Sequence, residues 1–178
     1  MIKGQDVLVL LKLFVSRNPD VPFHKLATDL DMSPAEVHEA TKRAEKSGLL
    51  AIIPSGRNQK KLIKRGALEE LLVHAVRYIC PPTLGPVTHG MPTIFGAPFF
   101  PKILLGDELP PVWPTLDGQT KGIEFSPIYR SAPAAAQRDP ALYELLVFVD
   151  AIRGGKARER EIGEAELRKR IRDGKSRE

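Results

Sequence analysis

The sequence predicts a mainly α fold in which a winged helix-turn-helix is followed by a proline-rich extended strap and C-terminal helices. Three observations lead to this fold class. Residues 22–50 contain two apolar helical stripes separated by a short turn. A basic hairpin sequence follows directly, over residues 50–64. Of the 16 prolines, 12 lie between residues 81 and 140, which disfavours long helices there.

The first expected element is a helix over residues 5–17. Its side chains are almost all apolar in the centre, where only Lys12 is polar. A helix of this kind must be covered on most of its sides. Because a small helix-turn-helix covers one side only, we expect the C-terminal half or a second subunit to cover the rest.

The next elements are two helices joined by the turn of residues 31–33. Ser33 is a good N-cap, Pro34 suits the first helical position, and Glu36 completes a capping box. A second helix is therefore expected over residues 34–47. Its apolar side should pack on the first helix, and its outward side chains are Ala35, His38, Glu39, Lys42 and Lys46.

A hairpin is expected after this helix, with a strand over residues 49–53, a turn over residues 54–59 and a returning strand over residues 61–64. From residue 57 to residue 65 the hairpin has no acidic side chain. Its basic residues are Arg57, Lys60, Lys61, Lys64 and Arg65. A loop that touches phosphates needs this charge, although a hairpin that is basic only for solubility would have it too.

The rest of the chain divides into a further helix, a strap and two more helices. The helix covers residues 67–79, and the strap of residues 80–138 is too apolar for a solvated linker, with a short strand near residues 122–125. Helices are expected over residues 139–152 and 157–172. Three domains follow: 1–79 for DNA binding, 80–138 as the strap, and 139–178 with C-terminal helices and a basic tail.

Charge is unevenly distributed along the chain, whose net charge is +5. Residues 1–79 hold 13 Lys and Arg against 9 Asp and Glu, residues 80–152 hold 4 against 7, and residues 153–178 hold 10 against 6. A basic head and tail could both approach a polyanion. The tail could equally be a solvated helix with mixed charges.

The sequence lacks the motifs that several classes of function require. Cys80 is the only cysteine, and no apolar run reaches membrane-spanning length. No histidine pair has the spacing of a helical metal site, and no nucleophile or phosphate-loop motif is present. We therefore expect no enzyme activity, no cofactor, no metal and no membrane partner, and a cytoplasmic location.

The run Leu26-Ala-x-x-Leu-x-Met-Ser-Pro-x-x-Val-x-x-x-x-x-Arg-Ala-x-x-x-Gly-Leu49 resembles the winged helix-turn-helix of bacterial transcription regulators, including the MarR type. The resemblance implies a recognition helix over residues 34–47, a wing tip over residues 54–61 and a homodimer. The chain departs from such regulators in residues 80–138, where they usually have long dimerising helices.

The resulting expectation is a dimeric regulator that binds double-stranded DNA at a two-fold operator. The expected DNA-binding residues are Ser33, Ala35, His38, Glu39, Lys42, Arg43, Lys46, Arg57, Asn58, Lys60, Lys61 and Lys64. The alternative is a protein-binding adaptor or antitoxin, in which the winged helix and the strap hold a partner protein. Carboxylates on the second helix repel phosphates and keep this alternative open. A winged helix that binds RNA is a third alternative.

Overall fold

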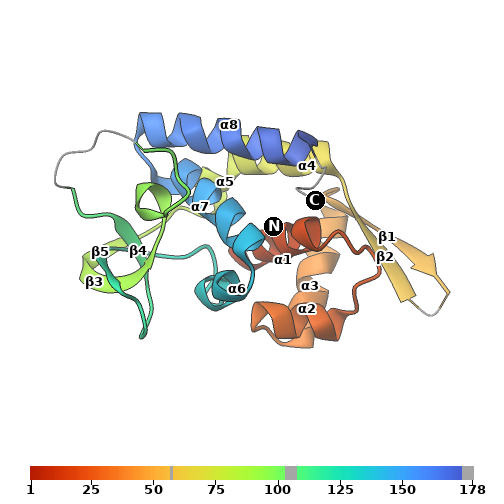
Figure 1. Cartoon of the computed structure of the whole chain (residues 1–178). Coiled ribbons are helices and arrows are strands. Elements are labelled where there is room, and N and C mark those ends of the chain that lie inside the picture. Colours follow the sequence, from red (N-terminus) through yellow and green to blue (C-terminus); the bar gives the residue numbers. More distant parts are fainter. Residues whose placement is uncertain (57, 103–107, 174–178) are drawn as a thin grey trace.

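A computed structural model describes residues 1–56, 58–102 and 108–173 of the 178-residue chain. Helices occupy the middle of the molecule, with α8 along one side (Figure 1). A two-stranded hairpin projects at one end, and a small three-stranded sheet lies at the opposite end.

The N-terminal part consists of three helices and the hairpin. Their bounds are Gly4–Ser16 for α1, Phe23–Leu30 for α2, Pro34–Lys46 for α3, Leu50–Ser55 for β1 and Asn58–Ile63 for β2. At the start of α1 the Asp6 carboxylate accepts the Lys3 backbone N–H at 2.9 Å, which caps the first turn. β1 and β2 are antiparallel, with Leu50 opposite Ile63.

A continuous helical stretch follows the hairpin and leads to the small sheet. It comprises α4 (Arg65–Glu70), a π-helical turn (Leu71–Ala75) and α5 (Val76–Ile79). The sheet contains β3 (Leu84–Pro92), β4 (Pro111–Pro114) and β5 (Thr120–Phe125), with a 3-10 turn at Ile94–Gly96 between β3 and β4.

The small sheet closes on itself, because β3 pairs with both β4 and β5 and these two also pair with each other. Such a tight closure requires small residues. A Cβ atom added to Gly90 would lie 2.0 Å from the carbonyl oxygen of Trp113, so only glycine fits where β3 crosses β4.

The C-terminal helices are α6 (Ala132–Arg138), α7 (Pro140–Gly154) and α8 (Ala157–Asp173). α7 begins at the N-cap Asp139, whose carboxylate accepts the Leu142 N–H at 3.1 Å. Most of α7 is buried, because α1, α5, α6 and α8 all pack on it. The predicted cover for the apolar helix α1 therefore comes from the chain's own C-terminal half.

One hydrophobic core joins all parts of the chain. Leu8 and Leu11 of α1, Trp113 of β4 and Leu146 of α7 all belong to it and are at most 1% exposed. The division into domains at residues 79 and 138 remains a prediction. No helix in the described ranges is both long and apolar enough to cross a bilayer.

The small sheet is fixed to α7 by a buried polar cluster. The Asp150 carboxylate accepts from the Trp113 indole N–H at 2.7 Å, from the Thr93 hydroxyl at 2.9 Å and from Arg153 at 2.6 Å. Arg153 also donates to the carbonyl oxygens of Cys80 and Ser126. Buried charge is tolerable only with this degree of pairing, so the cluster sets the position of the sheet on the helix.

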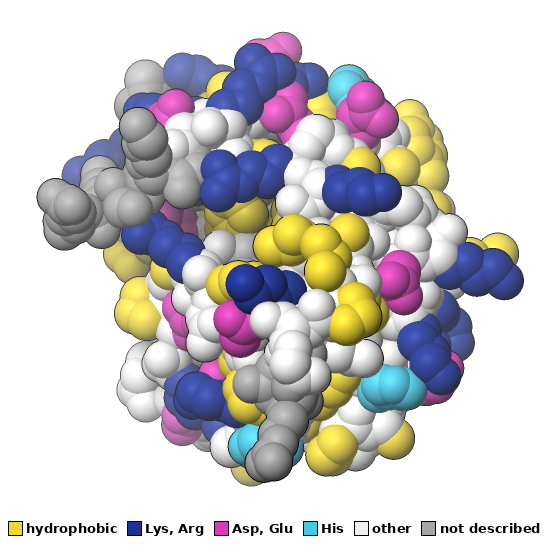
Figure 2. Space-filling model, turned by 90° about the vertical axis from the view of Figure 1, so that its right-hand side faces the viewer, with side chains coloured by type: hydrophobic (Ala, Val, Ile, Leu, Met, Phe, Trp, Pro, Cys, Tyr) yellow, Lys and Arg dark blue, Asp and Glu magenta, His cyan; other side chains and the backbone are white. Residues whose placement is uncertain are grey.

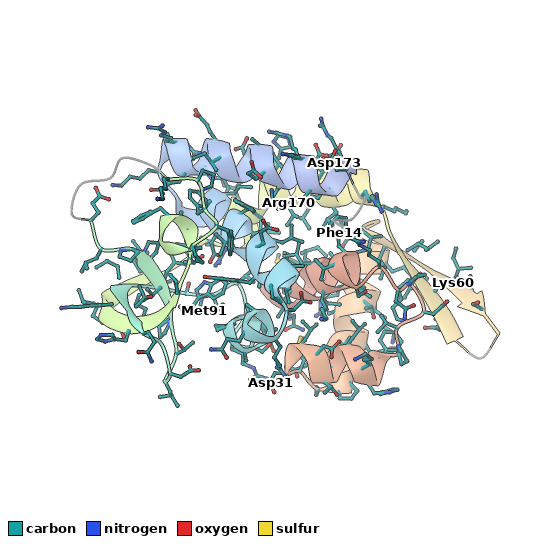
Figure 3. All side chains as sticks on the ribbon, in the orientation of Figure 1. Phe14, Asp31, Lys60, Met91, Arg170 and Asp173 are labelled. Atoms are coloured by element: carbon teal, nitrogen blue, oxygen red, sulfur yellow. The ribbon has the colours of Figure 1, made fainter. Side chains whose placement is uncertain are left out.

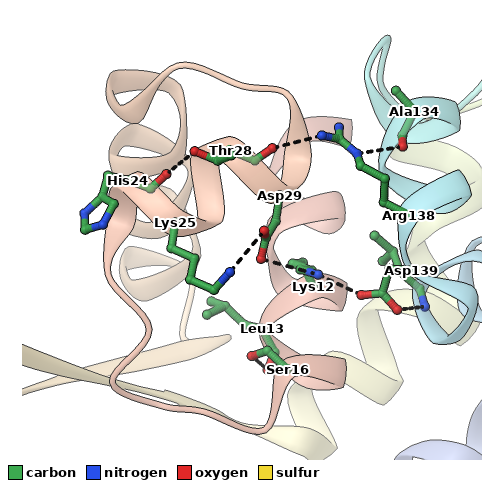
Figure 4. Close-up of polar contacts among 11 residues, drawn as sticks. Lys12, Leu13, Ser16, His24, Lys25, Thr28, Asp29, Ala134, Arg138 and Asp139 are labelled. Carbon is green, nitrogen blue, oxygen red and sulfur yellow. Dashed lines mark hydrogen bonds and ion pairs between the residues drawn. The ribbon is translucent and has the colours of Figure 1, made fainter.

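A second polar cluster fixes α2 to the C-terminal helices (Figure 4). Lys12 Nζ lies 2.7 Å from the Asp139 carboxylate and 3.6 Å from that of Asp29. Arg138 donates to the carbonyl oxygen of Thr28 at 3.3 Å. The single polar side chain in the centre of α1 is therefore the point where α1, α2 and α7 meet.

The predicted fold class is wrong. The chain is a mixed α/β structure with two sheets rather than a mainly α fold with an extended strap. Proline removes a donor from a strand but is tolerated at strand ends and edges. β3 ends at Pro92, and β4 begins at Pro111 and ends at Pro114, so the prolines that disfavour helices are compatible with these strands.

The N-terminal part is also not clearly a winged helix-turn-helix. Among the described residues its sheet has two strands only, and α1 packs against α7 as well as against α2 and α3. Residues 1–63 are therefore built into the same core as the C-terminal helices. A local sequence pattern does not reveal this, because the covering residues are far away in the chain.

Candidate nucleic-acid interface

The N-terminal turn of α3 is fixed by the predicted capping box. The Ser33 hydroxyl accepts the Glu36 N–H at 3.2 Å, and the Glu36 carboxylate accepts the Ser33 N–H at 2.8 Å. Pro34 occupies the first turn. After the helix, Gly48 has a φ of 75°, a left-handed conformation that favours glycine. The helix is thus held in register at both ends.

One side of α3 is buried, and the other side is left uncovered by the rest of the described chain. Its buried residues are Val37, Ala40, Thr41 and Ala44. The exposed residues of the helix and its N-cap are Ser33, Pro34, Ala35, His38, Glu39, Lys42, Glu45 and Lys46. The structure therefore brings six of the predicted site residues together on one face. We call the exposed side chains from Ser33 to Lys46 the α3 face.

Charges of both signs occur on the α3 face. Glu39 Oε1 lies 3.7 Å from Lys42 Nζ and 3.7 Å from His38 Nδ1. The His38 ring also meets the Phe23 ring edge to face, with 5.4 Å between centroids. Because the side chains of Lys42 and Glu39 are more than half exposed, their attraction is weak and a phosphate could compete for the lysine.

The hairpin separates its lysines onto two faces, because side chains alternate along a strand. Lys60 and Lys64 are exposed. Lys61 points inward, is 4% exposed and donates to the carbonyl oxygen of Val21 at 2.8 Å. Its ammonium also lies 4.5 Å from the centroid of the Phe23 ring. Burial lowers the pKa of Lys61, and the structure does not place this side chain with the exposed cations.

Arg43 is likewise turned away from the α3 face. Its guanidinium donates to both oxygens of Asp6, with a shortest distance of 2.7 Å. The Asp6 side chain is fully buried, and that of Arg43 is 23% exposed. Hydrogen bonding to Asp6 raises the pKa of Arg43. This pair joins α3 to the start of α1, so Arg43 supports the position of the helix.

Arg57 and Asn58 are the remaining two predicted residues of the site. Arg57 lies outside the described residues. Asn58 begins β2, where its backbone is opposite Ser55, and its side chain also lies outside the described part.

Sequence reasoning missed the segment between β5 and α6, which reaches the first turn of α3. The Tyr129 hydroxyl donates to Glu36 Oε1 at 2.6 Å, and Arg130 donates to the same oxygen at 2.9 Å. The hydrogen bond from Tyr129 is the main cause that lowers the pKa of Glu36 to about 2. No sequence signal indicates this contact, because the residues are more than 90 positions apart.

Arg130 changes the electrostatics at the start of α3. Its side chain is 77% exposed and its charge lies directly beside the Glu36 carboxylate. An acidic group near a helix N-terminus repels phosphates, and a neighbouring guanidinium offsets this repulsion. Arg130 therefore adds an exposed cation to the edge of the α3 face.

The exposed cations of this region could attract a polyanion. Among the described residues they are Lys42, Lys46, Lys60, Lys64, Arg65 and Arg130. In the part of the chain that the structure describes, no group of three or more His, Cys, Asp or Glu side chains is arranged to hold a metal ion. Figure 1 shows that the hairpin continues from the end of α3 and projects away from the helices.

Comparisons with known proteins give no match: no protein family, no curated protein and no solved structure is similar to this chain. The resemblance of residues 26–49 to bacterial regulators therefore stays a prediction.

Proposed function

We propose that the chain binds double-stranded DNA through the α3 face and the β1–β2 hairpin, and that it acts as a transcription regulator. The observation that carries the proposal is the uncovered polar side of α3, a helix whose other sides are tightly packed. The B-DNA major groove is wide enough to admit one α-helix. Exposed Lys42 and Lys46 on α3 and Lys60 on the hairpin supply positive charge for the flanking phosphates.

Two of the three carboxylates on α3 that argue against DNA binding lie beside a cation of the chain itself. Arg130 pairs with Glu36, and Lys42 lies beside Glu39. Glu39 could also accept a hydrogen bond from a cytosine amino group at a base edge. Compensation by the chain itself lowers the repulsion that phosphates would meet at the start of α3.

The test is fluorescence anisotropy with a labelled duplex of random sequence at several salt concentrations. Lys42→Glu combined with Lys60→Glu should weaken binding about tenfold or more at every sequence. It should also make the salt dependence less steep, by about 0.9 in the log-log slope for each phosphate that the variant no longer neutralises.

A matched control keeps the change in net charge the same. Lys102 and Lys121 are exposed, and Lys121 lies on β5 in the sheet at the opposite end from the hairpin (Figure 1). Lys102→Glu combined with Lys121→Glu should leave affinity within about twofold, apart from the long-range effect of charge, which salt screens. Equally weakened binding in both double variants would show that the effect comes from net charge and would reject the proposed interface.

The proposed regulator is cytoplasmic and forms a homodimer. A symmetric dimer reads two half-sites about one helical turn apart. Sedimentation velocity over a range of protein concentrations tests the oligomeric state, and a monomer at all concentrations, with and without DNA, rejects the dimer.

A second candidate function is a protein-binding adaptor or antitoxin. It is favoured by exposed apolar side chains where α5 leads into β3. Tyr78 is 73% exposed, Leu84 70%, Val87 49% and Ile79 40%. Exposed apolar residues gathered in this way are typical of protein contacts. If duplex DNA does not bind at low salt, the adaptor becomes the better proposal.

A further inference from the structure

A groove of about 840 Å³ lies between α1, β2, α7 and α8, on the side of the molecule where the hairpin projects. Its volume is typical of small-molecule sites. Figure 3 shows Phe14 of α1 beside Arg170 and Asp173 of α8, all of which line it. Figure 2 shows this side of the molecule, where lysine and arginine side chains lie above and beside the hydrophobic side chains near the centre, and acidic side chains also border them.

The floor of the groove is apolar. It is formed by Leu13, Phe14 and Val15 of α1, Ile63 of β2 and Leu145 of α7. Leu13 and Leu145 belong to the buried core, and the other three pack against that core with part of their surface still open. A ligand would gain free energy by covering this remaining apolar surface.

The rim of the groove carries positively charged side chains. Arg65 lies over the ring of Phe14, 5.8 Å from its centroid, and Arg17 and Lys169 also line the groove. None of these three cations forms an ion pair with another residue in the described ranges. A negatively charged ligand group would therefore meet free donors.

The acidic residues of the groove are largely compensated. Arg170 donates to Glu144 at 2.5 Å and also pairs with Glu166. Asp173 is the remaining acidic residue among those that line the groove. Among the described residues, three lining cations and one lining carboxylate form no ion pair, and this balance favours an anion over a cation at the rim.

We infer that this groove binds a small amphipathic organic anion, with an apolar body on the floor and one carboxylate directed at Arg65 and Lys169. The ligand contacts β2 on one side and α8 on the other, since Leu62, Ile63 and Lys169 all line the groove. A bound ligand therefore holds the hairpin against the C-terminal helices. Because Lys60 lies on the same strand, the ligand changes DNA affinity, a consequence that rests on the proposed function.

Binding itself is tested first, by isothermal titration calorimetry of the full chain with sodium octanoate. Octylammonium has the same apolar body with the opposite charge, and acetate has the same charge without the body. Octanoate should bind saturably with one site per chain, and both other probes should bind at least about tenfold more weakly, equivalent to about 1.4 kcal/mol.

Variants locate the site. Ala141 is exposed, lies in the first turn of α7 and lines the groove, whereas Ala157 is exposed in the first turn of α8 and does not line it. Ala141→Trp should reduce octanoate affinity about tenfold or more, and the matched Ala157→Trp should leave it unchanged. Arg65→Ala combined with Lys169→Ala should abolish the preference for octanoate over octylammonium. Circular dichroism and thermal unfolding verify that each variant is folded.

Three results would overturn the inference: no saturable binding of octanoate, equal binding of octylammonium, or unchanged binding by folded Ala141→Trp. The effect of octanoate on DNA binding is tested separately from octanoate binding itself. If octanoate binds but wild-type protein does not bind DNA, the groove assignment stands and the proposed function fails. If both bind and saturating octanoate leaves DNA affinity unchanged, the coupling is wrong.

Discussion

Replacement of Arg43 by alanine tests whether this residue supports α3 or contacts DNA. The substitution leaves the Asp6 carboxylate fully buried without its cationic partner. Among the described residues, the Asp6 carboxylate then keeps the hydrogen bond from the Lys3 N–H alone. Removing one partner of a buried ion pair costs about 3–5 kcal/mol. Because the Arg43 side chain is 23% exposed, we expect a smaller loss, about 2–4 kcal/mol.

Urea denaturation followed by circular dichroism measures this loss directly. For a chain of this size, each kcal/mol corresponds to about 2–4 °C in Tm, so Tm should fall by about 4–16 °C. Lys42→Ala is the matched control on the same helix, because its side chain is 59% exposed, and it should change the free energy of unfolding by less than about 0.5 kcal/mol.

The double variant Asp6→Leu with Arg43→Met removes both charges and should recover part of the stability. In the DNA assay, folded Arg43→Ala should keep the wild-type salt slope, whereas Lys42→Ala should reduce it. If Arg43→Ala is as stable as Lys42→Ala and flattens the salt slope, Arg43 contacts phosphate and the structural role argued for it is refuted.

Three further predictions concern other contacts. Tyr129→Phe should raise the pKa of Glu36 from about 2 toward its usual value of 4.5, as measured by NMR titration of the side-chain carboxyl carbon. Because the pKa of Glu36 is lower in the folded chain than in the unfolded chain, ionised Glu36 stabilises the fold above its unfolded pKa. The free energy of unfolding of the wild type should therefore fall as pH drops from about 5 toward 2, and that of Tyr129→Phe should fall less steeply. Identical dependence of the two proteins on acid pH would contradict this. Lys61→Met should fold with stability within about 1.5 kcal/mol of wild type, because the ammonium donates to carbonyl oxygens, those of Val21 and Gln59. It should bind DNA with an unchanged salt slope, because the side chain is buried; a reduced slope would show that Lys61 reaches DNA. Trp113→Phe should lower the free energy of unfolding by about 1–3 kcal/mol, because the buried Asp150 carboxylate loses an indole donor. An unchanged urea midpoint would show that this hydrogen bond does not stabilise the fold.

The sequence predicts most of the helices because their signals are local, but it misses α6, which lies within the expected strap of residues 80–138. Ser33, Pro34 and Glu36 fix the start of α3, which runs over Pro34–Lys46 against an expected 34–47. Asp139 and Pro140 likewise mark the start of α7. Capping and apolar spacing depend on residues within one or two turns, so one sequence is enough to read them.

The small sheet could not be predicted in the same way. The sequence predicts a strand only near residues 122–125, within the Thr120–Phe125 range of β5. β3 and β4 depend on pairing with each other and with β5, and their prolines hide the usual alternation. Pairing of distant segments leaves little trace in a single sequence.

The candidate site could be predicted on one face only. Lys42 and Lys60 are exposed, as a DNA contact requires, whereas Lys61, which was also expected at the DNA, is buried. Alternation along β2 explains why these neighbouring lysines point in opposite directions. Arg43 and Arg130 depend on partners far away in the chain, Asp6 and Glu36, and no local pattern indicates either contact.

The most direct test of the central claim is the affinity of the wild-type chain for duplex DNA as a function of salt. If the α3 face and the hairpin bind DNA, the wild-type chain should bind at low salt, with log affinity falling linearly against log salt by about 0.9 for each phosphate contact. Lys42→Glu with Lys60→Glu should give a flatter line. Absence of binding at low salt, or the same line for this variant and for Lys102→Glu with Lys121→Glu, would contradict it.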